Sequence, residues 1–213
     1  MEKKLTHFDG NGNAVMVDVT DKQPTDVYKR QPLLPLGEGC ILESTINSFK
    51  SAGFERIEVV VGYQRHKVIP LLRKMKVHYS ENRDYDETDM MESVRIGIRA
   101  VDPETKGVLF CPGDVPLIAP ETIVRVAETF QEKQPKLLIP TFEGQPGHPP
   151  MFSGYVMQSI LEYRGEEGLR GVFKQFKDST CFLEVDDEEI LQDTDLPSDY
   201  ERLQRAYELR QKG

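Results

Sequence analysis

The stretch "GVLFCPGDVPLIAPE", residues 107–121, decides the fold class of this 213-residue chain. Its first five residues form a continuous apolar run, which is typical of a strand buried on both faces of a parallel sheet. The chain then turns through Gly113 and Asp114, and a helix is predicted to begin at Pro120. Ligands of open α/β sheets bind outside the carboxyl ends of the strands. The stretch therefore predicts a parallel sheet that delivers a carboxylate to its ligand-binding edge.

Apolar runs and amphipathic segments alternate from Pro32 onward. Residues 41–54 place their apolar side chains on one helical stripe, and Gly53 is suited to end that helix. The predicted strands cover residues 56–62, 76–82, 107–111, 136–140 and 181–185. Strands that alternate with helices predict an α/β fold, with a mostly parallel sheet covered by helices on both faces.

The first 31 residues differ from this pattern. They contain one short apolar run, "AVMVDV" at residues 14–19, which is too little to form a core alone. We therefore expect residues 1–31 to be a foreign or fused segment, partly disordered, and residues 32–213 to form the folded domain. Residues 14–19 are apolar enough to fill the position of a first strand.

Composition narrows the classes of function. The formal net charge is −9 and the acidic residues are spread along the chain, which argues against non-specific nucleic-acid binding. No apolar run is long enough to cross a bilayer, so we expect no membrane partner. The three cysteines are far apart, which favours buried thiols in a cytoplasmic protein over a zinc ribbon or a redox pair.

Two acidic positions could hold a divalent cation. Asp114, at the end of a buried strand, suits Mg²⁺, which prefers hard oxygen ligands, but an aspartate is also common in such turns. Asp193 and Asp195 precede Pro197, where they could add a second carboxylate or cap the last helix. The residues alone leave both alternatives open.

Several polar loops could line a ligand site. "PTFEGQPGHPPMF", residues 140–152, constrains His148 either as part of a ligand loop or as a solvated surface turn. "ENRDYDETDMMES", residues 81–93, could line a pocket, or Asp89 could cap the helix that follows. Arg170 could bind an anionic substrate or pair with a nearby glutamate. Residues 186–189 are predicted to form a solvated turn.

Six short motifs occur in an order that resembles the MobA-like nucleotidyltransferases, and especially their molybdenum cofactor cytidylyltransferase branch. They are "PLLPLG", "ENRDY", "PGDVPLI", "GHPPMF", "GEEGLRG" and "DTDLPSDY", and the resemblance covers residues 32–209. It implies a Rossmann-like sheet and Mg²⁺-dependent transfer of CMP from CTP, favoured over GTP, to molybdopterin, with release of pyrophosphate. The alternatives are an inactive nucleotide-binding or regulatory module and a sugar-phosphate nucleotidyltransferase.

The resemblance also assigns residues by position. Asp114 and Asp195 would be the catalytic metal ligands. The nucleotide set would be Asp89, Met90, Ser93 and Gly113. The acceptor set would be Gly147, His148, Pro149 and Arg170. A molybdoenzyme or a maturation factor would be a partner.

One departure from the family pattern is severe. The family begins with a strand that runs into a phosphate loop of the form L-A-A-G-x-S-x-R-M-G-x-x-K, whose amides and cations hold the triphosphate. At that position this chain reads "QPTDVYKRQ", residues 23–31, with Gln31 in place of the lysine and no glycine between Asn13 and Leu36. We therefore expect the first strand to be missing or replaced and the activity to be weak or absent.

The altered region itself resembles two other sequences. Residues 5–22 are similar to the amino terminus of cyclic pyranopterin monophosphate synthase, and residues 26–31, "DVYKRQ", resemble a translated library adaptor. We interpret the chain as a chimera of two molybdenum cofactor genes joined through that adaptor. The alternative is a natural fusion with an unusual linker.

Overall fold

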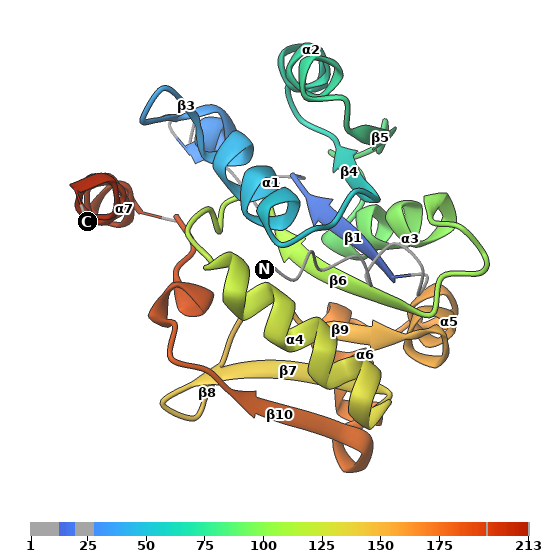
Figure 1. Cartoon of the computed structure of the whole chain (residues 1–213). Helices are drawn as coiled ribbons and strands as arrows, with labels where there is room; N and C mark the ends of the chain where they lie inside the picture. The colour runs from blue at the N-terminus through green and yellow to red at the C-terminus, as the bar shows by residue number, and fades with distance from the viewer. Residues whose placement is uncertain (1–12, 20–27, 195, 213) are drawn as a thin grey trace.

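A seven-strand path runs through the central sheet of the computed structural model, which describes residues 13–19, 28–194 and 196–212 (Figure 1). Its order is β10 (Thr180–Glu184), β7 (Leu137–Phe142), β9 (Met151–Ser153), β6 (Gly107–Pro112), β1 (Asn13–Asp18), β4 (Ile57–Val61) and β5 (His78–Glu81). A short eighth strand, β8 (Gln145–Pro146), pairs with β7. The β6–β1–β4–β5 pairs and the β10–β7 pair are parallel, so the predicted α/β class is confirmed.

The first-strand position is occupied. β1 lies at the centre of the sheet, in parallel register with β6 on one side and β4 on the other. Val15, Met16 and Val17 are each fully buried, as expected for a strand covered on both faces. The expectation that residues 14–19 could fill this position is therefore confirmed, and the first strand is replaced rather than missing.

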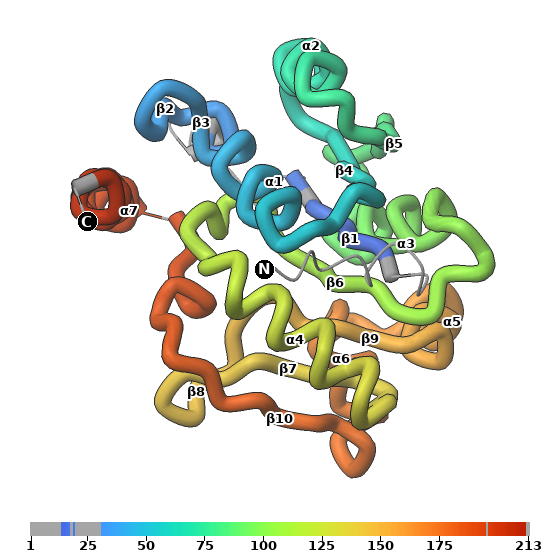
Figure 2. Tube along the Cα trace, in the orientation of Figure 1, coloured from blue at the N-terminus to red at the C-terminus, as the bar shows by residue number. Residues whose placement is uncertain are grey.

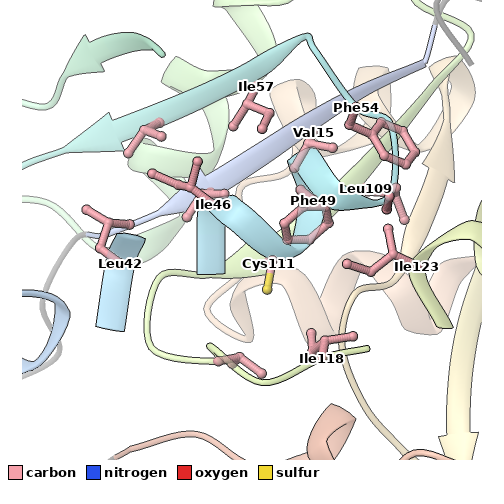
Figure 3. Packing of buried hydrophobic residues seen from close by; sticks show 14 of the residues in the cluster. Val15, Leu42, Ile46, Phe49, Phe54, Ile57, Leu109, Cys111, Ile118 and Ile123 are labelled. Carbon is pink, nitrogen blue, oxygen red and sulfur yellow. The ribbon is translucent and has the colours of Figure 1, made fainter. Parts of the chain in front are cut away.

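Helices cover both faces of the sheet. α1 (Ile41–Ser51), α2 (Arg65–Met75) and α4 (Pro120–Lys133) bury their apolar stripes in one cluster, in which Val15 and Leu109 meet Ile46 and Phe49 of α1 (Figure 3). α3 (Met90–Ala100), α5 (Gly154–Glu162) and α6 (Gly168–Gln175) pack on the opposite face around Met16. Thus successive side chains of β1 pack into two separate hydrophobic cores, one on each face of the sheet.

The last helix, α7 (Pro197–Lys212), packs apart from these layers, beside a hairpin of β2 (Pro35–Leu36) and β3 (Gly39–Cys40) (Figure 2). Leu203 of α7 is buried against Leu36, Ile41 and Leu117. Three short 3-10 turns, Tyr28–Leu33, Lys177–Ser179 and Glu188–Leu191, complete the described elements. No helix in the described part of the chain is both long and apolar enough to cross a membrane.

Strand β9 was not anticipated. It begins within the predicted loop 140–152 and inserts antiparallel between β6 and β7. Its three residues, "MFS", are too few to show a period in the sequence. Because β9 runs opposite to its neighbours, the loop that precedes it lies at the carboxyl end of β6.

Candidate active site

The loop after β6 is held in place by hydroxyl groups from distant segments. Thr45 of α1 donates to the Gly113 carbonyl at 3.2 Å, and Thr194 donates to the Asp114 carbonyl at 3.1 Å. Oδ1 of Asp114 is shielded from solvent. The structure therefore places Gly113 and Asp114 at the carboxyl edge of the sheet, as predicted, in a loop with a fixed backbone.

The cysteine at the end of β6 takes no part as a nucleophile. Cys111 is fully buried, and burial raises the pKa of its thiol well above the usual value, with a further increase from the negative charge of Asp114. A thiol that stays protonated is a poor nucleophile and a poor metal ligand. The candidate for chemistry at this end of β6 is therefore the Asp114 carboxylate rather than the Cys111 thiol.

The carboxylate oxygens of Asp114 suit a divalent cation that also binds oxygens of the substrate. The described residues contain no group of three or more His, Cys, Asp or Glu side chains that could hold a metal ion. Mg²⁺ commonly needs only one or two protein carboxylates, because waters and substrate phosphates complete its shell. Asp114 supplies one carboxylate, whereas Asp195 lies outside the described residues. Its neighbour Thr194 contacts Asp114 directly, so the chain brings the two predicted segments together.

The predicted nucleotide set lies around the start of α3. Asp89 is the N-cap of this helix and accepts a hydrogen bond from the Glu92 amide at 3.2 Å, so its capping role is confirmed. Ser93 is buried and accepts a hydrogen bond from the Asn82 side chain at 2.9 Å, while Met90 is half-buried. Since Asn82 follows β5, the set lies at the same edge of the sheet as Asp114.

The predicted acceptor loop is packed, not solvated. The His148 amide donates to the Ile190 carbonyl at 2.8 Å, and the His148 ring lies 6.4 Å from the ring of Phe110, edge to face. A Cβ added to Gly147 would come within 2.6 Å of the same Ile190 carbonyl, so glycine is needed there. Pro149, buried, follows through a cis peptide bond. The surface-turn alternative for His148 is therefore wrong, and the loop lies beside β6.

Arg170 stays apart from these contacts. It is exposed on α6, and Glu167, one of the nearby glutamates, pairs with Lys174. The Lys174 hydrogen bond is the main cause that lowers the pKa of Glu167, and the charge of Arg170 has a smaller influence. The start of α6 approaches α3, because a Cβ at Gly168 would lie 3.7 Å from Met91. Arg170 thus lies on the helix next to the nucleotide set.

The predicted solvated turn at residues 186–189 is wrong. Asp187 is only 8% exposed, and its Oδ2 accepts hydrogen bonds from the Ala119 amide at 3.0 Å and the Thr122 hydroxyl at 2.7 Å. This carboxylate therefore caps α4 from a distant part of the chain. A signal existed in the sequence, because α4 begins at Ala119-Pro120 with no side chain able to cap it.

A separate cavity of about 370 Å³ lies between the β2–β3 hairpin, α1 and α7. Its walls include Ser44 and Ser48, whose hydroxyls donate to the Pro116 carbonyl. The cavity therefore lies behind the loop that carries Asp114, and none of the predicted site residues lines it. The polar groups that could perform chemistry are at the sheet edge instead.

The fold is shared with several solved structures. The crystal structure of Rv0371c from Mycobacterium tuberculosis H37Rv superposes with a TM-score of 0.75 at 22% identity, over 91% of this chain and 97% of that chain. A further structure of that protein is a complex with manganese. A nucleotidyl transferase from Methanothermobacter gives a TM-score of 0.78 at 21% identity, over 95% of this chain and 100% of that chain.

A 4-diphosphocytidyl-2C-methyl-D-erythritol synthase from Anaerococcus prevotii gives a TM-score of 0.73 at 14% identity, over 94% of this chain and 97% of that chain. Among curated protein sequences, none matches this chain. The MobA-like NTP transferase domain matches residues 29–180, which is well over half of the chain and includes the loop of Asp114. This chain therefore belongs to the MobA-like NTP transferase family and is a nucleotidyltransferase enzyme.

Proposed function

We propose that this enzyme transfers CMP from CTP to a molybdopterin-type acceptor, with Mg²⁺ bound at Asp114 and Asp195. The observation that carries the proposal is the hydrogen bond between Thr194 and the Asp114 carbonyl, which joins two segments 80 residues apart in the chain. The similarity of the fold to a diphosphocytidyl synthase supports a cytidine nucleotide. The manganese complex of Rv0371c supports a divalent cation.

The reaction needs alignment and charge neutralisation more than acid–base chemistry. An oxygen of the acceptor phosphate attacks the α-phosphorus, the bond from the α-phosphorus to the bridging oxygen breaks, and pyrophosphate leaves. The bound metal ion would neutralise charge on the phosphates. In this proposal the nucleotide set holds the donor near α3, and Gly147, His148 and Pro149 present the acceptor beside β6. Arg170 would attract its anionic groups.

A second candidate, a nucleotide-binding module without turnover, is favoured by the altered phosphate loop. No glycine lies between Asn13 and Leu36, and the neutral Gln31 stands where the family pattern has a lysine. Backbone amides of a glycine-rich loop ordinarily hold the triphosphate, so their loss weakens both binding and alignment. Nucleotide affinity without pyrophosphate release would identify this module. A panel of sugar phosphates and molybdopterin would distinguish the acceptors.

We also propose how the chain originated and in which compartment the protein works. Residues 1–31 are foreign to the domain formed by residues 32–213, and "DVYKRQ" marks the junction. Sequencing the locus from a library prepared without that adaptor tests this origin, and an intact six-codon junction there would refute it. The buried free thiols of Cys40 and Cys111 support a reducing cytoplasm, where a molybdoenzyme or a maturation factor would receive the product.

The test of the reaction is pyrophosphate release from CTP and GTP in the presence of Mg²⁺ and molybdopterin. Three proteins are compared: the chain as it stands, its Asp114→Asn variant, and a repaired chain in which a family-type strand and phosphate loop precede Pro32. We expect strong activity, with a preference for CTP, in the repaired chain, weaker activity in the chain as it stands, and loss of activity in either chain when Asp114→Asn is added. A repaired chain that does not release pyrophosphate with any acceptor would refute the proposed reaction.

A further inference from the structure

We propose that Gln31 is a positioning residue that sets the segment of Thr194 against the loop of Asp114. It is the last residue of the "DVYKRQ" junction. This inference rests on the proposed function in one respect, which is that Asp114 binds the cation.

The central observation is a pair of hydrogen bonds in the interior. Gln31 is 9% exposed, and its Nε2 donates to the Thr194 carbonyl at 2.6 Å. Thr194 is 2% exposed, and its hydroxyl donates to the Asp114 carbonyl at 3.1 Å. Residues 31, 194 and 114 are therefore connected in a line, although they come from three distant parts of the chain.

The backbone around Gln31 is itself anchored. The Gln31 carbonyl accepts a hydrogen bond from the Leu34 amide at 3.0 Å, and the Leu34 carbonyl accepts one from the Ile41 amide at 3.1 Å. Ile41 begins α1, which also holds the Asp114 loop through the hydroxyl of Thr45. The turn that carries Gln31 and the loop that carries Asp114 are thus fixed to the same helix.

The amide of Gln31 acts on the peptide bond that follows Thr194. A carbonyl held by a hydrogen bond fixes the plane of its peptide group. Because the Thr194 hydroxyl also donates to the Asp114 carbonyl, fixing the Thr194 peptide group helps to fix the loop that carries Asp114. Loss of the Gln31 donor would free the plane and leave a buried carbonyl without this partner.

The same hydrogen bond distinguishes the role of Gln31 from that of the lysine that the family pattern has at this position. The Gln31 amide is neutral and is committed to a main-chain carbonyl, so it gives the triphosphate no positive charge. A lysine here could also donate to the Thr194 carbonyl. Consequently a donor of either kind would preserve the position of the segment, whereas an apolar side chain of the same length would not.

The test measures Mn²⁺ binding to the full chain, without nucleotide, by the electron paramagnetic resonance signal of free Mn²⁺. Gln31→Met keeps the volume and removes the donor, and we expect Mn²⁺ to bind roughly three- to tenfold more weakly. Gln31→Lys keeps a donor and should restore affinity to within about twofold of the wild type. Gln175→Met, an exposed glutamine on α6, is the matched control and should leave Mn²⁺ affinity unchanged.

Melting temperatures recorded on the same samples separate positioning from a purely structural role. If Gln31→Met melts earlier but binds Mn²⁺ as tightly as the wild type, the positioning role is refuted. If Gln31→Met does not fold, Thr194→Val interrupts the same line at its second hydrogen bond and is expected to weaken Mn²⁺ binding by a similar factor. Unchanged Mn²⁺ affinity in that variant would equally overturn the proposal.

The Asp114→Asn variant distinguishes this failure from failure of the proposed function. Mn²⁺ binding that depends on Asp114 but not on Gln31 would reject the positioning role alone. If the wild type binds no Mn²⁺ that Asp114→Asn removes, both the metal site and the role of Gln31 are wrong.

Discussion

At the scale of single residues, two aspartates near the sheet edge differ in how far the sequence reveals their role. Asp114 was identified from the sequence as a candidate metal ligand because an apolar strand leads toward it. Asp187 was not, since its neighbours "DDEE" at residues 186–189 read as a charged turn. The hydrogen bond from the Ala119 amide, 68 residues away in the chain, shows that Asp187 caps α4. Asp187 is also buried.

Asp187→Ala tests that cap. The change leaves the partly buried Ala119 amide and the buried Thr122 hydroxyl without their acceptor, so we expect the free energy of unfolding to fall by roughly 1–3 kcal/mol. Urea unfolding followed by circular dichroism measures it. Asp186→Ala, at the exposed neighbouring position, is the control and should change stability by less than about 0.5 kcal/mol. Equal effects of the two changes would contradict the capping role.

Glu189 gives a prediction about pH. Burial raises its pKa above the ordinary value of 4.5, and the nearby Arg210 and Arg202 oppose this increase only in part. The folded state therefore holds the proton more tightly than the unfolded state, so the contribution of Glu189 to stability is present below pH 4.5 and is lost as the pH rises through the folded pKa. The glutamine of the Glu189→Gln variant does not ionise, so this variant lacks the pH-dependent contribution of Glu189.

The stability difference between wild type and Glu189→Gln should therefore move against the wild type as the pH is raised from about 4 to about 7. Urea unfolding of both proteins at four pH values across that range measures the difference. A difference that moves in the opposite direction would mean that the two arginines outweigh burial, and that Glu189 is a net favourable ion pair.

At the scale of elements, β1 shows how a short apolar segment completes a sheet. Its side chains alternate between the two cores, and "AVMVDV" satisfies both faces because nearly every residue in it is apolar. α3 accommodates the largest of these side chains. A Cβ on Gly97 of this helix would overlap the side chain of Met16, so glycine at position 97 and methionine at position 16 fit together.

Gly97→Ala tests this fit between α3 and β1. Because the added methyl group overlaps a fully buried side chain, we expect a loss of roughly 1–3 kcal/mol in the free energy of unfolding. In a Met16→Ala background the space is free, and the higher helix propensity of alanine, worth about 1 kcal/mol, should make the same change neutral or stabilising. Additive effects in the double variant would show that the two residues do not interact.

At the scale of the whole molecule, the segment before Pro32 supplies the central strand. Fully burying a Val or Met side chain contributes roughly 1.5–3 kcal/mol, so Val15, Met16, Val17 and Val19 together contribute about as much as the whole stability of an ordinary domain. Without β1, the facing edges of β4 and β6 would also lose their hydrogen-bond partners.

A chain that starts at Pro32 should therefore lack a cooperative melting transition and should bind the dye ANS, as proteins with exposed apolar surface do. Thermal unfolding by circular dichroism and ANS fluorescence measure these properties. A peptide of residues 13–31 added in trans should restore the transition, because it returns both the strand and Gln31. A truncated chain that melts as the full chain does would show that the domain is complete without β1.

The sequence alone determined the α/β class, the parallel strands from residue 56 onward and Asp114 at the end of β6. These depend on local patterns, namely apolar runs, helical stripes and the residues that follow a strand. The tertiary structure decided the rest: that residues 13–18 form the central strand, that β9 inserts antiparallel, that Asp187 is buried, and that Gln31 reaches Thr194. Each of these depends on contacts between residues far apart in the chain, which no local pattern encodes.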